Sequence, residues 1–93
     1  MDTVQLDGNS LDAITFATRN TKILVIRATN GLLGCGYIST ETAAKVGDAL
    51  AIVSGVSNYE DMLKASVKAV SPAAEALDVR PGMSGRDALL KML

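Results

Sequence analysis

The sequence predicts an α+β fold in which a mostly antiparallel β-sheet of about five strands comes first and short helices follow. Two observations favour this fold. The first half of the chain carries short apolar runs separated by turn residues, and the second half carries serine or asparagine caps ahead of helically spaced apolar residues. Because 93 residues support only one small core, residues 1–93 are expected to form a single domain.

The strands are expected in the first 53 residues, at 4–6, 13–18, 22–28, 32–38 and 49–53. The runs 22–28 and 32–38 flank the turn Thr29-Asn30-Gly31, which predicts an antiparallel hairpin. The connection from the fourth strand to the fifth is about as short as a parallel crossover can be. We therefore expect that crossover to be right-handed if the two strands are parallel.

Four short helices are expected, each after a capping residue: Ser39 or Thr40, then Asn58, Ser71 and Ser84. Gly47 is expected to end the first helix. Proline after Ser71 suits the first position of the third helix.

The amount of helix is too small for the amount of apolar sheet. Residues 22–28 and 49–53 are apolar on both faces, which is typical of strands covered on both sides. The short helices can cover only one face, so the other face is expected to lie in a subunit interface. The sequence thus predicts that the partner of this protein is a second copy of itself, bound through β-sheet packing.

Composition excludes several function classes. Nine basic and ten acidic residues are scattered along the chain, so no nucleic-acid partner is expected. No apolar run approaches the roughly 20 residues that span a membrane, and the start MDTVQLDG lacks the pattern of a secretory signal. With a single cysteine, these features predict a cytoplasmic protein without a membrane partner.

The chain contains no histidine. This excludes the Ser-His-Asp and Cys-His arrangements within one chain and removes the commonest ligand of transition metals. The carboxylates are scattered without the spacing of a metal site, so neither a metal nor a cofactor is expected.

Cys35 is the first candidate for chemistry, because it lies between Gly34 and Gly36 in an expected strand. Glycine weakens a strand unless something approaches the backbone or the strand bulges. Cys35 is therefore either a reactive thiol, activated by a nearby cation or helix N-terminus, or a small buried residue whose neighbouring glycines allow tight packing.

The second candidate is the segment PGMSGRD at 81–87, where Ser84 and Gly85 begin a helix between Arg80 and Arg86. Helix N-termini bind anions, so a small phosphate or carboxylate ligand would fit there. The other interpretation is an ordinary capped helix with solvated arginines.

Several segments together resemble one family. They are CGYI at 35–38, GDALAIVSGVSNYEDML from Gly47, PAAEAL at 72–77 and GMSGRDALLKM at 82–92. In this order and spacing they are similar to the YunC-like family of bacteria and archaea, a domain of unknown function (DUF1805). The resemblance covers about residues 4–93. It implies an α+β domain whose N-terminal sheet takes part in tetramer formation, and it implies no activity.

Two hypotheses about function follow. The first is a small cytoplasmic homo-oligomer, with four copies as the form that the resemblance implies, which acts as a binding or scaffold domain. The second is a small-molecule enzyme or ligand sensor that uses Cys35 together with an anion site at the helix N-terminus near Ser84. The sequence leaves open whether the protein is an enzyme.

Overall fold

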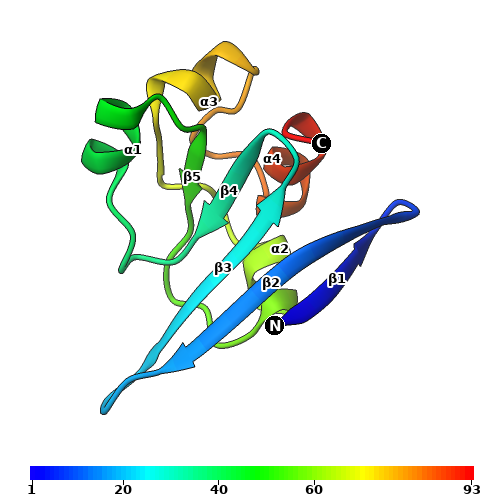
Figure 1. Ribbon diagram of the computed structural model, residues 1–93, viewed down its shortest axis with the longest axis vertical. Coiled ribbons are helices and arrows are strands. Elements are labelled where there is room, and N and C mark those ends of the chain that lie inside the picture. Colours follow the sequence, from blue (N-terminus) through cyan, green and yellow to red (C-terminus); the bar gives the residue numbers. More distant parts are fainter.

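The fold is α+β, as expected, with one six-stranded sheet and four short helices. A computed structural model describes residues 1–93, and the strands follow the order β1-β2-β3-β4-β5-β6 across the sheet (Figure 1). The strands are β1 (Asp2–Leu6), β2 (Asn9–Ala17), β3 (Lys22–Ala28), β4 (Gly31–Gly34), β5 (Leu50–Ile52) and β6 (Ala69–Val70), and the helices are α1 (Thr40–Val46), α2 (Tyr59–Lys64), α3 (Pro72–Ala76) and α4 (Gly85–Lys91). Only β4 and β5 pair in parallel.

The hairpin of β2 and β3 is longer than the strands beside it. β1 pairs with β2 only as far as Ala13, and β4 pairs with β3 only from Val25 onward. The remaining end of the hairpin therefore projects beyond the rest of the sheet, which Figure 1 shows at the lower left.

The fourth strand is shorter than expected, because it ends at Gly34 and not at residue 38. The Cys35 N–H still donates to the Leu24 carbonyl, but the chain then turns, and the Ile38 N–H donates back to the Cys35 carbonyl at 3.0 Å. A Cβ atom on Gly34 would lie 2.9 Å from a side-chain carbon of Ile38. Gly34 thus lets the chain fold back over the strand end, so the expected strand 32–38 was too long.

The helices lie on both faces of the sheet, but unequally. The covered face, which carries Leu24, Ile26 and Leu33, packs against α2, α3 and α4 in one core cluster of 19 buried residues. In Figure 1, α2 and α4 lie behind β2 and β3. We expected all helices on one face, but α1 packs Ala43 on the opposite face, over β5. As a result all three residues of β5 are buried.

The helix caps follow the sequence signals. Ser39, Asn58, Ser71 and Ser84 are the four N-cap residues, and each side chain accepts a hydrogen bond from a backbone N–H of the first turn. Gly47 ends α1 with a φ of 82°, a conformation that glycine adopts without steric cost. The sixth strand was not expected, because its two residues are too few to show a period in the sequence.

Candidate functional site

One face of the sheet stays uncovered over β2, β3 and the start of β4. Residues that are opposite each other in neighbouring strands point to the same side, and the pairs Ile14 with Val25 and Asp12 with Arg27 lie on the side away from α2 and α4. We call this surface the open face and define it by Asp12, Ile14, Phe16, Val25, Arg27 and Leu32.

The open face is apolar at its centre. Ile14, Val25 and Leu32 are each only partly buried, and Phe16 keeps 59% of its surface exposed. A hollow of about 190 Å³ lies among Ile14, Val25 and Leu32. We call it the sheet hollow. Exposed apolar surface of this kind marks a place where another molecule packs.

An ion pair borders the sheet hollow. Arg27 donates a hydrogen bond to the Asp12 carboxylate directly across the β2 and β3 ladder. Both residues line the hollow, and their side chains are 60% and 50% exposed in the single chain. The open face thus combines an apolar centre with one positive and one negative charge.

Cys35 lies in the core at the end of β4. Its side chain is buried, with 6% of its surface exposed. The Leu24 N–H donates to the Cys35 sulfur at 3.4 Å, and the Cys35 N–H donates to the Leu24 carbonyl at 3.1 Å. The sulfur therefore takes the place of a backbone carbonyl where the strand ladder ends. Of the two flanking glycines, Gly34 is in close contact with Ile38, whereas a Cβ on Gly36 would meet nothing within 4 Å.

The N-terminus of α4 is docked against the end of α2. The Gly85 N–H donates to the Ala65 carbonyl at 2.9 Å, and the Asp87 N–H donates to the Ser84 hydroxyl at 3.1 Å. A Cβ atom on Gly85 would lie 2.0 Å from the Met62 carbonyl oxygen. Two of the N–H groups that could bind an anion therefore already have partners, and Gly85 provides the close approach of the two helices.

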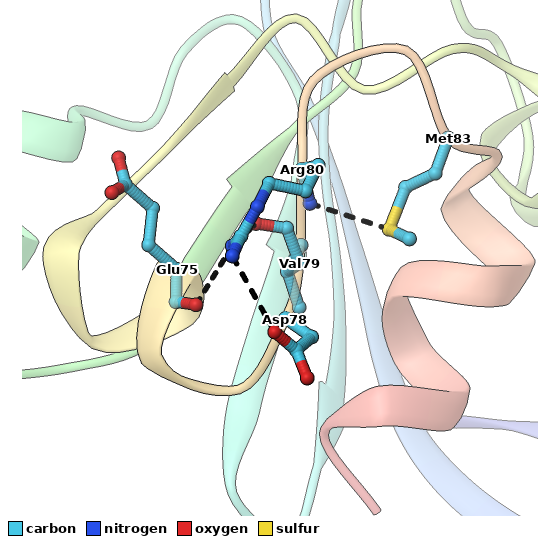
Figure 2. Close-up of polar contacts among 5 residues, drawn as sticks. All are labelled: Glu75, Asp78, Val79, Arg80 and Met83. Carbon is cyan, nitrogen blue, oxygen red and sulfur yellow. Dashed lines mark hydrogen bonds and ion pairs between the residues drawn. The ribbon is translucent and has the colours of Figure 1, made fainter.

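The two arginines of this segment also have partners. Arg86 donates to the Asp7 carboxylate in the turn after β1. Arg80 donates to the Glu75 carbonyl at 2.7 Å and to the Asp78 carboxylate at 3.4 Å, as Figure 2 shows. The Arg80 side chain thus closes the loop between α3 and α4, and none of the surface hollows is lined by Cys35, Ser84 or either arginine.

A smaller polar cluster joins α2 to the first two strands. The Tyr59 hydroxyl donates to the Asp2 carboxylate at 2.6 Å and accepts from the Thr15 hydroxyl at 2.8 Å. Burial, followed by the hydrogen bond to Asp2, raises the pKa of Tyr59 above its usual value of 10.0.

Elsewhere, no three acidic or cysteine side chains gather as they would around a metal ion. No helix is long and apolar enough to cross a membrane.

Comparison with known proteins places the chain in a family. The family model described as "Domain of unknown function (DUF1805)" matches residues 34–92. The chain belongs to this family. An uncharacterized protein, YunC of Bacillus subtilis (strain 168), is 30% identical to it over 94 residues, which covers 97% of this chain and 93% of that protein.

A similar fold has been solved by crystallography. A crystal structure of a protein of unknown function, TA1206 from Thermoplasma acidophilum, superposes with a TM-score of 0.93 at 32% identity, covering 99% of this chain and 90% of that chain. The family match and the similarity to YunC confirm the family resemblance of the sequence. Neither relative carries a named activity.

The residues of the open face are not evident from the sequence alone. The segment 22–28 is apolar on both sides, but the side that the helices cover depends on packing across the whole chain. The signal for the Asp12 and Arg27 pair is the β2 and β3 register, which the four-residue turn at 18–21 sets. Residues 13–18 alternate only weakly in the sequence, so the shared face of Ile14 and Phe16 does not stand out.

Proposed function

We propose that this protein is a small cytoplasmic homo-oligomeric binding or scaffold domain of the DUF1805 family, which assembles by packing its open face against the same face of a second copy. The observation that carries this proposal is the exposure of Phe16, which projects from the uncovered side of β2. Two sheets pack face to face about 10 Å apart and interdigitate their side chains. Phe16 and the sheet hollow therefore offer a projection and a recess on one surface.

A second copy suits this surface better than an unrelated protein. In a two-fold contact the same patch meets itself, so the patch must be complementary to itself. The open face fulfils this condition in shape through Phe16 and the sheet hollow, and in charge through Asp12 and Arg27. The partly buried Ile14 and Val25 would lose their remaining contact with water in such a contact.

The number of copies that we propose is four, as the family resemblance implies. A closed tetramer with two-fold axes requires two different self-complementary surfaces. The second exposed apolar region lies beside α1, where a hollow of about 390 Å³ is lined by the exposed Tyr37 and Val46. This hollow supports a second contact. The expected result for Val46→Asp is therefore a particle half the native mass.

Light scattering after gel filtration tests the proposal through the molar mass at micromolar concentration. We expect the native protein to form a multiple of its 9.7 kDa chain mass, and Phe16→Asp to form a smaller particle. Leu77→Asp is the matched control, because Leu77 is also exposed but lies after α3, away from the open face. Circular dichroism checks that each variant is folded. A native protein of monomer mass would contradict the proposal.

A further inference from the structure

The Asp12 and Arg27 pair continues the apolar rows of the open face. Asp12 is two residues before Ile14 on β2, and Arg27 is two residues after Val25 on β3, so all four side chains point to the same side. A second sheet that covers Ile14 and Val25 would also cover part of this pair. The ion pair would then lose water on the side that faces the second copy.

The pair has unused hydrogen-bonding capacity within the chain. One guanidinium N–H group of Arg27 binds one carboxylate oxygen of Asp12, and the chain supplies neither side chain with another partner. A guanidinium has five donors and a carboxylate accepts at two oxygens. An ion pair that is removed from water while its remaining donors and acceptors have no partner destabilises the assembly, because the lost hydration is not replaced. An interface that covers the pair must therefore supply further partners.

We infer that Asp12 and Arg27 bind across the interface, with Arg27 of each copy meeting Asp12 of the other, and that this exchange fixes how the two sheets align. The inference rests on the proposed function. A two-fold axis that lies between the two packed sheets, parallel to the strands and midway between β2 and β3, places Arg27 of each copy opposite Asp12 of the other. An axis along the line from Asp12 to Arg27 would instead place like charges opposite each other. The four charges then form one neutral network in which the spare donors and acceptors are used. A sheet that is shifted by one strand would place like charges or unpaired charges together, so the network disfavours it.

The experiment uses two variants with opposite charges, Asp12→Lys and Arg27→Glu. Each variant alone places like charges on both sides of the contact, so we expect self-association weakened by roughly tenfold or more. When the two variants are mixed in equal amounts, Arg27 of one meets Asp12 of the other, and Lys at position 12 meets Glu at position 27. We expect mixed particles to form with near-native affinity. Added salt should weaken both the repulsion in each single variant and the attraction in the mixture. Native mass spectrometry distinguishes mixed from uniform particles.

The double variant Asp12→Lys with Arg27→Glu is the control, because it restores opposite charges in every pairing and is expected to associate with itself. Native particle mass in both single variants would overturn the inference, as would single variants that dissociate and fail to combine when mixed. The proposed function is judged separately: it fails if Phe16→Asp leaves the particle mass unchanged or if the native protein is a monomer. The charge variants can therefore fail while the proposed function stands.

Discussion

Strand β3 carries two rows of aliphatic side chains that meet different surroundings. Leu24 and Ile26, on the covered face, are buried beneath the helices, whereas Val25, between them, is only partly buried on the open face. The residue types are similar, so composition does not cause the difference. The position of the helices therefore determines which row of side chains becomes core, and the other row stays available for a partner.

The two faces of the sheet are covered unequally because of where the helices pack. α4 packs against α2 and against β4, and Gly85 in α4 lets the two helices approach closely. Only the seven-residue α1 lies on the other side, and it covers β5 without reaching β2. The sheet is therefore covered on both faces at β5 and on one face at β2 and β3.

The largest effect that separates the two faces is expected from alanine substitutions at neighbouring positions of β3. Leu24→Ala removes a fully buried side chain and should lower the free energy of unfolding by about 2–5 kcal/mol. Val25→Ala should cost the isolated chain less than about 1 kcal/mol but weaken self-association. Urea unfolding, at protein concentrations too low for assembly, measures the free energy of unfolding of both variants. Equal losses at the two positions would contradict the distinction between the faces.

A second comparison uses two glycines. Gly85→Ala would place a methyl group 2.0 Å from the Met62 carbonyl, where neither helix backbone can yield cheaply. We expect it to lower the free energy of unfolding by about 1–3 kcal/mol. Gly36→Ala is the matched control, because its methyl group would meet nothing within 4 Å, and it should change stability by at most about 0.5 kcal/mol. If both variants unfold at the same temperature as the native protein, the close packing of α4 on α2 does not stabilise the covered face.

Much of the local structure could be predicted from the sequence, because its signals are local. The caps at Asn58, Ser71 and Ser84 each need only a side chain within three residues of the N–H that it accepts from, and all three were confirmed. Gly47 likewise ends α1 as expected. The end of β4 at Gly34 could not be read in this way, since it depends on where the Ile38 side chain packs.

The candidate sites depended on contacts between distant residues. Arg86 binds Asp7, which lies 79 residues earlier in the chain, so the sequence could not show that its charge is already paired. The sequence makes Ser84 and Gly85 candidates for an anion site or for an ordinary helix cap, and the structure places them where two helices dock. The hypothesis of a small-molecule enzyme or sensor with Cys35 stays a prediction.

Cys35 provides the third test, at the place where the covered face ends. Because the sulfur is buried and accepts from the Leu24 N–H, iodoacetamide should modify it far more slowly in the folded protein than in urea. Cys35→Ser puts a buried hydroxyl in this position and should cost about 1 kcal/mol. Mass spectrometry of the alkylated protein follows the reaction. Rapid modification of the folded protein that phosphate suppresses would instead favour the hypothesis that joins Cys35 to an anion site near Ser84.

The smallest effect on the free energy of unfolding is expected from a substitution at Tyr59, where α2 meets the outer end of the covered face. Its pKa is raised in the folded protein by burial and by the hydrogen bond to Asp2, so the folded state holds the hydroxyl proton more tightly than the unfolded state does. This contribution to stability is complete below pH 10.0, the usual tyrosine value, and is lost as the pH rises through the higher value of the folded protein.

Tyr59→Phe removes both the titrating group and its two hydrogen bonds, to Asp2 and Thr15. We expect a loss of about 1 kcal/mol or less near neutral pH, because these groups can bind water instead. The difference in unfolding free energy between native protein and variant should then shrink above pH 10, since ionised Tyr59 lies close to the Asp2 carboxylate. Urea titrations from pH 7 to pH 11 measure this difference. Tyr37→Phe is the control, because Tyr37 is exposed on the other side of the sheet. A difference that stays constant from pH 7 to pH 11 would contradict a raised pKa of Tyr59 in the folded protein.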